Sequence, residues 1–307
     1  IRSSDPKALV RALFAPIAED MAAVDAIIRE ELDSDVPRMR EIGEHIVNAG
    51  GKRMRPALLM LICRALGYEG ELHRYLGATI ELLHTATLMH DDVVDESAVR
   101  RGKPTANALW GNGVAVLVGD FLYTRSFQMM IRAGNLRVMQ ALADAANTLA
   151  EGEVKQMVNA HDPTVDEKRY FEVIERKTAC LFEAGAKMAA AIADCSEKDE
   201  AAVREYALAL GNAFQIVDDM LDYTGVSSDI GKNLGADLRE GKVTLPLLYA
   251  RLHTSEENRA LIDAAIRSGN GDFDKISSIV IESQAIARCK QRAEQELERG
   301  KAALLQL

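Results

Sequence analysis

The stretch Leu88-Met89-His90-Asp91-Asp92-Val93-Val94-Asp95 decides the fold. It completes an apolar run that starts at Ile80, which predicts a helix ending in an acidic cluster. On such a helix Asp91 and Asp95 lie one turn apart on the same face, with Asp92 beside them. Like charges this close repel each other, and Mg²⁺ prefers carboxylate oxygens and often bridges to phosphates. For this stretch alone, a bound cation and a solvated acidic helix end both remain open.

A second acidic cluster favours the cation. Asp218-Asp219-Met220-Leu221-Asp222 repeats the spacing 127 residues later (218 − 91), again after apolar residues. Two such clusters on helices could face each other and hold a polyphosphate through metal ions. The repeat therefore predicts a site for a metal and a phosphate.

Composition predicts an all-α chain. The 307 residues are 48% hydrophobic and only 5% aromatic, with no proline between Pro104 and Pro163 or between Pro163 and Pro246. Abundant alanine and leucine in long proline-free runs favour helices. Because no linker or low-complexity tract interrupts the chain, we expect one domain over residues 1–307.

Charge and cysteine content exclude several classes of protein. The net charge of −10 argues against a general nucleic-acid binder. The four cysteines show no C-x-x-C spacing, which predicts free thiols in a reducing cytoplasm. No apolar run reaches the roughly 18 residues of a membrane span. The chain begins at Ile1 without a methionine, so targeting from this end stays open.

Apolar periodicity and turn residues predict twelve helices. We expect them at 6–32, 36–49, 56–66, 71–95, 105–132, 136–160, 164–193, from 196 through the second cluster, 243–253, 256–268, 272–282 and 284–306. Residues 100–104 are expected as a loop, and residues 225–241 as a glycine-rich loop that contains Lys232.

Two basic stretches accompany the acids. Gly51-Lys52-Arg53-Met54-Arg55-Pro56 places cations at a helix start, where they oppose the helix dipole unless an anion binds. Arg100-Arg101-Gly102-Lys103-Pro104 follows the first acidic cluster. The basic stretches and the acids could together hold a diphosphate and its metals. A structural ion-pair network is the alternative.

These motifs, in this order, resemble those of the trans-isoprenyl diphosphate synthases, also called polyprenyl synthetases. The resemblance rests on Gly51 to Pro56, His84, both acidic clusters, Arg100-Arg101-Gly102, Lys177-Thr178, Gln215 and Gly231-Lys232. It covers nearly the whole chain. The stretch from His84 through Gly119-Asp120-Phe121 is most similar to bacterial long-chain octaprenyl and solanesyl diphosphate synthases, which make quinone side chains.

The resemblance implies the isoprenoid synthase fold, a single large helical bundle around a central catalytic cavity. It also implies a cytoplasmic homodimer that condenses isopentenyl diphosphate head to tail with an allylic diphosphate such as farnesyl diphosphate. About three Mg²⁺ ions would assist ionisation of the allylic substrate, in keeping with oxygen-ligand preference. The long lipid product favours contact with a membrane surface, although no basic amphipathic segment supports it.

The resemblance also assigns roles to residues. The metal ligands would be Asp91, Asp92, Asp95, Asp218, Asp219 and Asp222. Arg100, Lys177, Gln215 and Lys232 would bind the allylic substrate, and Lys52, Arg55, His84 and Arg101 would bind isopentenyl diphosphate. Oxygens near Thr178 and Gln215 could stabilise the carbocation, and the released diphosphate would take the final proton.

Residues before the first cluster predict product length. In the family, bulky aromatics four and five residues before the first aspartate stop the product short. Here those positions hold Thr87 and Ala86, both small. By analogy with the family, an open tunnel of this kind implies a product of about 40–50 carbons.

Four alternative functions exist for this set of motifs. A shorter-chain farnesyl or geranylgeranyl diphosphate synthase would keep the same chemistry. An all-α metal-dependent phosphohydrolase could use His90-Asp91 with His45 and His84, but it leaves the paired clusters unexplained. A terpene cyclase has no need of the basic residues. A non-catalytic synthase subunit typically lacks one acidic cluster, and both are intact here.

Overall fold

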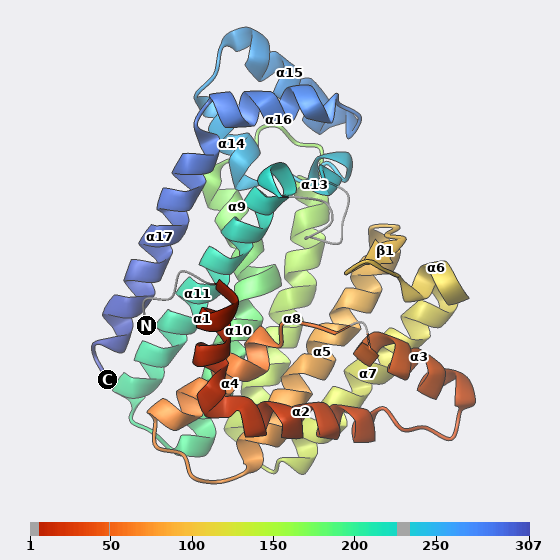
Figure 1. The fold of residues 1–307 in the computed structure, drawn as a ribbon, viewed down its shortest axis with the longest axis vertical. Coiled ribbons are helices and arrows are strands. Elements are labelled where there is room, and N and C mark those ends of the chain that lie inside the picture. Colours follow the sequence, from red (N-terminus) through yellow and green to blue (C-terminus); the bar gives the residue numbers. More distant parts are fainter. Residues whose placement is uncertain (1–5, 49, 226–233) are drawn as a thin grey trace. The chain divides into compact units, whose positions relative to one another are not determined.

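The computed structural model describes residues 6–48, 50–225 and 234–307. The all-α prediction is confirmed, since the strands within these residues form only one short hairpin (Figure 1). Two compact units can be distinguished. The first comprises 1–98, 105–143 and 184–203, and the second comprises 99–104, 144–183 and 204–307. The expectation of a single domain over 1–307 stays a prediction.

The helices of the first unit precede those of the second along most of the chain. The first unit contains α1 (Pro6–Phe14), a 3₁₀ turn (Ala15–Ile17), α2 (Ala18–Glu31), α3 (Pro37–Asn48), α4 (Met54–Ala65), α5 (Leu72–Val94), α6 (Ala106–Trp110) and α7 (Asn112–Arg132). The second contains β1 (Val99–Arg100), β2 (Lys103–Pro104), α9 (Glu167–Ile174), a π-helical turn (Glu175–Ala179), α13 (Ala236–Arg239), α14 (Leu245–Leu252), α15 (Glu256–Ser268), α16 (Phe273–Glu282) and α17 (Ala285–Leu304). Both units share α8 (Leu136–Asn159), α10 (Cys180–Ala193) and α11 (Glu197–Thr224).

Helix α5 is the central element of the first unit and packs against α2, α4 and α7. Its residues Leu76, Ile80 and Leu83 are fully buried at helical spacing, so one face of α5 lies in the core. At Gly77 the approach is so close that a Cβ atom would lie 2.6 Å from Met60 Cε. Tight packing on several sides fixes α5, which carries the first acidic cluster at its end.

Two predicted helices of the first unit are wrong in extent. The predicted helix 6–32 is broken by the 3₁₀ turn at Pro16, since proline lacks the N–H that a helix interior needs. The predicted helix 105–132 is two helices, because Gly111 adopts a φ of +84° between α6 and α7. Glycine allows this backbone turn without the clash of a Cβ atom.

The segment 100–104, predicted as a loop, belongs to a hairpin. Strands β1 and β2 pair antiparallel, with Arg100 opposite Lys103. Arg101 and Gly102 connect them at φ values of +53° and +74°. A two-residue turn with both φ values positive suits the right-handed twist of the flanking strands.

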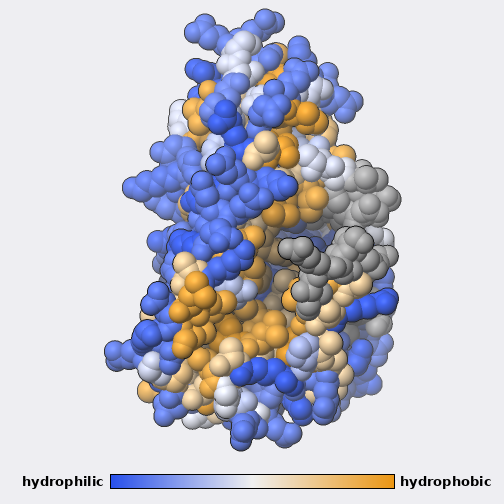
Figure 2. Space-filling model, turned by 60° about the vertical axis from the view of Figure 1, so that its left-hand side comes forward, coloured by the Kyte–Doolittle hydropathy of each residue, from blue (hydrophilic) through white to orange (hydrophobic). Residues whose placement is uncertain are grey.

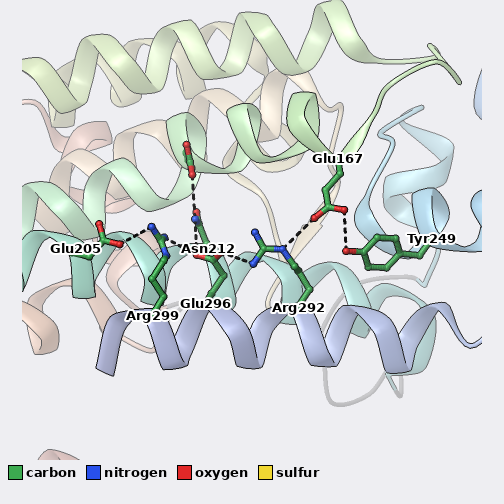
Figure 3. A network of polar contacts seen from close by, with 8 residues as sticks. Glu167, Glu205, Asn212, Tyr249, Arg292, Glu296 and Arg299 are labelled. Carbon is green, nitrogen blue, oxygen red and sulfur yellow. Dashed lines mark hydrogen bonds and ion pairs between the residues drawn. The ribbon is translucent and has the colours of Figure 1, made fainter. Parts of the chain in front are cut away.

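A network of charged side chains ties α17 to its neighbours in the second unit (Figure 3). The buried carboxylate of Glu296 accepts hydrogen bonds from Arg292 (2.5 Å), Arg299 (2.7 Å) and Asn212 (3.2 Å). Asn212, on α11, also reaches Glu175 at the start of the π-helical turn, at 3.4 Å. The network therefore links α17 with α11 and with the π-helical turn.

The same network extends to α9 and α14. Arg292 Nε donates to Glu167 Oε1 at 3.2 Å, and the other oxygen of Glu167 accepts from the Tyr249 hydroxyl at 3.2 Å (Figure 3). The Arg292 guanidinium also lies over the Phe171 ring, 4.2 Å from its centroid. Four helices of this unit are thus held by one set of polar contacts.

We expect Glu296→Gln to lower the free energy of unfolding by about 3 kcal/mol at pH 7, since breaking a buried ion pair leaves its partners uncompensated. Burial alone would raise the pKa of Glu296, but Asn212, Arg292 and Arg299 hold that pKa below its ordinary value of 4.5. The carboxylate therefore stabilises the fold fully above pH 4.5, and this contribution is lost as the pH falls through the lowered pKa.

Urea unfolding of the wild type and of Glu296→Gln, at pH 7 and at about pH 3, measures their free energies of unfolding. The difference in free energy of unfolding between the wild type and Glu296→Gln should be smaller at the lower pH. Glu298→Gln is the matched control, because Glu298 lies on the same helix but its side chain is 70% exposed in a pair with Lys301. The control should cost no more than about 0.5 kcal/mol. An equal effect of both substitutions would contradict a special role for the buried carboxylate.

Candidate active site

The first acidic cluster lies at the carboxyl end of α5. The helix ends at Val94, and the Asp95 N–H donates to the Asp91 carbonyl at 2.8 Å. Asp92 is buried, and its carbonyl accepts from Asn107 Nδ2 at 3.1 Å. Carboxylates at this end meet the negative pole of the helix dipole as well as each other. The first cluster therefore concentrates negative charge at one end of α5, where a cation could bind.

The second cluster lies in the last two turns of α11. Asp218 is exposed, whereas Asp219 is buried and accepts two hydrogen bonds, from the Tyr170 hydroxyl at 2.6 Å and from Gln215 Nε2 at 2.7 Å. The Gln215 Oε1 atom in turn accepts from the Thr178 hydroxyl at 2.7 Å. The hydrogen bonds therefore run from Thr178 through Gln215 to Asp219. Because Thr178 and Asp219 hold opposite sides of the Gln215 amide, they fix its orientation.

Asp222 has a different setting from Asp219. Its carboxylate accepts from the backbone N–H groups of Gly235 (3.0 Å), Ala236 (3.3 Å) and Asp237 (3.3 Å) at the start of α13. The third aspartate of the cluster thus caps a short helix, in addition to any role toward a metal.

Burial and neighbouring acids perturb the protonation of this cluster. Burial, followed by the charge of Asp237, raises the pKa of Asp219 well above its ordinary range. The same two causes, in the same order, raise the pKa of Asp222 to about 6. A carboxylate with a raised pKa destabilises the folded chain once the pH exceeds its ordinary value, and the loss is complete above the raised value. A bound cation would remove this cost at neutral pH.

Sequence reasoning missed Tyr170 and Asp237. Tyr170 is buried on α9, and burial, with Asp219 beside it, raises its pKa well above the ordinary value. It lies 49 residues before Asp219 and belongs to no spaced motif, so the sequence carries no signal for it. Asp237 could have been suspected only from its place in the glycine-rich segment that follows the second cluster.

Lys177 and Thr178 lie in the π-helical turn, where the sequence predicts an unbroken helix over 164–193. The Lys177 ammonium contacts Glu153 Oε2 at 2.6 Å and Gln156 Oε1 at 2.9 Å on α8. Two glycines face the turn: a Cβ at Gly152 would lie 2.8 Å from Lys177 N, and one at Gly211 would lie 2.6 Å from Ala179 Cα. Helices α8 and α11 thus enclose the turn closely, and π-helical turns are frequent at functional sites.

The predicted basic site residues of the first unit lie at the start of α4 and in the middle of α5. Lys52 is exposed just before α4, and Arg55 lies half-buried in its first turn. His84 is half-buried on α5. Arg53, between the two cations, has a φ of +47°, which costs a residue with a Cβ atom about 1–2 kcal/mol.

The two predicted chain-length positions lie one turn before the first cluster. Ala86 is fully buried on α5. Thr87 is also buried, and its hydroxyl donates to the His84 carbonyl at 2.8 Å. Small side chains therefore occupy both positions on the helix that leads to Asp91.

Two further predicted residues lie in the hairpin of the second unit. Arg100 and Arg101 belong to the hairpin, with Arg101 exposed at its turn. Lys232 lies outside the described residues. Among the residues that the structure describes, no three histidine, cysteine, aspartate or glutamate side chains cluster closely enough to hold a metal alone. The aspartates of the two acidic clusters nevertheless suit Mg²⁺. This ion keeps several waters and takes further oxygens from substrate phosphates, so it does not need a full set of protein ligands.

Comparison with known proteins assigns the chain to a family. The sequence model described as polyprenyl synthetase matches residues 36–282. The chain is 48% identical over 289 residues to the octaprenyl diphosphate synthase of Escherichia coli (strain K12), covering 94% of this chain and 90% of that protein.

Solved structures agree with the sequence comparison. The polyprenyl synthase of Caulobacter crescentus CB15, complexed with calcium and isoprenyl diphosphate, matches with a TM-score of 0.94 and 39% identity, covering 99% of this chain and 93% of that one. A decaprenyl diphosphate synthase from Rhodobacter capsulatus matches with a TM-score of 0.90 and 45% identity, covering 96% and 92%. The predicted isoprenoid synthase fold is thereby confirmed.

Proposed function

Because this chain belongs to the polyprenyl synthetase family and is a prenyltransferase, we propose that it extends an allylic diphosphate with isopentenyl diphosphate. The condensation is head to tail and trans, and farnesyl diphosphate or a similar compound is the primer. The observation that carries the proposal is the pair of acidic clusters, each at the negative end of a helix. Such clusters are suited to a cation-bridged diphosphate.

The acidic residues would hold Mg²⁺, about three ions in each active site. The ligands are Asp91, Asp92 and Asp95 from α5, and Asp218, Asp219 and Asp222 from α11. The all-oxygen donor set and the raised pKa values of Asp219 and Asp222 fit this metal. When bound, Mg²⁺ neutralises the charge of the departing diphosphate. The calcium in the Caulobacter complex supports a divalent cation.

The chain's own residues bind and orient the two substrates. Arg100, Lys177, Gln215 and Lys232 hold the allylic diphosphate, and Lys52, Arg55, His84 and Arg101 hold isopentenyl diphosphate. The hydrogen bonds from Thr178 to Gln215 and from Gln215 to Asp219 keep side-chain oxygens in place, where they can stabilise an allylic cation. The released diphosphate takes the final proton.

The product is a polyprenyl diphosphate of about 40–50 carbons that serves for quinone side chains. It grows into a tunnel that begins beside Asp91. Small, buried Ala86 and Thr87 support this length. The names of the similar proteins, octaprenyl and decaprenyl diphosphate synthase, correspond to eight and ten prenyl units and support it too. A shorter-chain synthase is the alternative.

The protein works as a homodimer in the cytoplasm. Helix α7 exposes Val116, Leu117 and Ile131, and a second copy could cover these apolar side chains. All four cysteines are free thiols, which fits a reducing compartment.

The protein also contacts a membrane surface, which would receive the lipid product. Hydrophobic residues also gather on the face shown in Figure 2, which supports such contact. Among the described residues, no helix combines the length and the apolar character that crossing a bilayer requires.

A metal-dependent phosphohydrolase is the second candidate, because it could use His90 beside Asp91. His90 Nε2, however, lies 3.3 Å from both the Val116 carbonyl and Asp120, and His45 packs edge-on against Trp110. These contacts favour structural roles for both histidines.

Label incorporation separates the two candidates. Purified protein with labelled isopentenyl diphosphate, farnesyl diphosphate and Mg²⁺ should form an extractable labelled lipid, and EDTA should abolish its formation. Diphosphate release without incorporation of the label would favour the hydrolase.

A further inference from the structure

Arg53 differs from the cations on either side of it. Its guanidinium points into the first unit, where Nη1 donates to Glu81 Oε1 at 2.8 Å and Nε donates to Asp25 Oδ1 at 3.2 Å. The Arg53 side chain is 14% exposed and that of Glu81 only 4%. An arginine held in this way is occupied by protein carboxylates rather than by substrate.

The same residue shapes the backbone that carries Lys52 and Arg55. Arg53 is the left-handed residue at the start of α4, and its carbonyl accepts the first helical hydrogen bond, from Ala57 N at 3.0 Å. A non-glycine residue keeps this conformation only where its surroundings enforce it. The ion pairs with Glu81 and Asp25 hold Arg53 in this conformation, since they fix the far end of its side chain.

Glu81 connects this turn to the other part of the proposed substrate site. It lies on α5, one turn before His84, and its carbonyl accepts from the Thr85 hydroxyl at 2.7 Å. Asp25 lies on α2, which packs against both α4 and α5. The contacts of Arg53 therefore join the start of α4 to the segment of α5 that presents His84.

We propose that Arg53 and Glu81 are positioning residues for isopentenyl diphosphate, because their ion pair sets the spacing between the Lys52–Arg55 turn and His84. The proposal rests on the proposed function. The pair touches no substrate. It acts by fixing three groups that do, and a small displacement of such groups is costly to binding and rate.

Steady-state kinetics with the two substrates varied separately tests the proposal. Glu81→Gln keeps the shape of the side chain but removes its charge. Its KM for isopentenyl diphosphate should rise about tenfold, while its KM for farnesyl diphosphate should change less than about twofold. Asp25→Asn removes the half-exposed partner and should raise the first KM about twofold to threefold. This milder variant keeps the test valid if Glu81→Gln folds poorly.

Asp20→Asn is the matched control. The buried Asp20 of α2 pairs with Arg74 Nε of α5 at 2.8 Å, so it ties α2 to α5 two turns before Glu81. The control should lower the melting temperature and leave both KM values within about twofold of wild type.

Four outcomes would decide against the proposal. Equal rises of both KM values in Glu81→Gln, or the same kinetic change in Asp20→Asn, would reduce the pair to general structural support. Unchanged KM values in a folded Glu81→Gln would remove its positioning role while leaving the proposed function intact. A wild-type protein that elongates no allylic diphosphate would overturn the proposed function, and this proposal with it.

Discussion

Asp219→Asn should lower turnover about a thousandfold, which corresponds to about 4 kcal/mol of lost transition-state stabilisation. Asp219 is only 4% exposed, lies in the second cluster and is oriented by Tyr170 and Gln215. Asparagine keeps the shape of the side chain but removes the charge that attracts a metal. Turnover with saturating substrates and Mg²⁺ measures the effect.

The same substitution should not weaken the fold in the absence of metal. Burial raises the pKa of Asp219, so its charged form costs stability at neutral pH. Removing the charge should leave the metal-free melting temperature equal or higher, and it should reduce the rise that Mg²⁺ produces in the wild type. A fall in metal-free stability together with the lost activity would instead indicate misfolding.

Two further variants calibrate the result. Tyr170→Phe removes one hydrogen bond to the carboxylate and should lower turnover about tenfold, as expected for a bond to a charged group. Asp263→Asn changes an ion-paired aspartate of the same unit, held by Arg251, and should leave turnover within about twofold. If Asp219→Asn keeps more than a tenth of wild-type turnover, Asp219 is not a metal ligand.

Ala86→Tyr should shorten the product from about eight or more isoprene units to about three or four, since a bulky ring would close the proposed tunnel. Ala86 is fully buried, one turn before the first cluster. Chromatography of the dephosphorylated products measures their length. Product length that stays unchanged would refute the tunnel beside α5.

Stability gives this prediction a second readout. A tyrosine that enters an open tunnel should change the melting temperature little, whereas one forced into a packed core should cost about 1–3 kcal/mol. Ala86→Ser is the matched control, because its hydroxyl can bond to a carbonyl of the preceding turn. The control should keep both the stability and the product length of the wild type.

The sequence predicts most of what depends on local spacing. Helix α5 follows from the apolar run before Asp91, and its end coincides with the first cluster, as expected. The all-α class follows from composition. The breaks at Pro16 and Gly111 also have local causes, although periodicity alone passes over them.

Features that depend on packing could not be predicted in this way. The π-helical turn at Lys177 lies close against Gly152 and Gly211, which come from other helices. Tyr170 reaches Asp219 across 49 residues of sequence. Arg53 looks like one more cation of a basic stretch until its contacts with Glu81 and Asp25 are seen. Long-range contacts override local pattern at each of these places.

The length of the wild-type product tests the central claim most directly. We would incubate the protein with Mg²⁺, labelled isopentenyl diphosphate and farnesyl diphosphate, and then resolve the dephosphorylated products by chain length. The account predicts a ladder that ends near about eight to ten isoprene units, because the two chain-length positions, Ala86 and Thr87, hold small side chains. A product that ends at three or four units would contradict it, since Ala86 and Thr87 would then not leave the tunnel open.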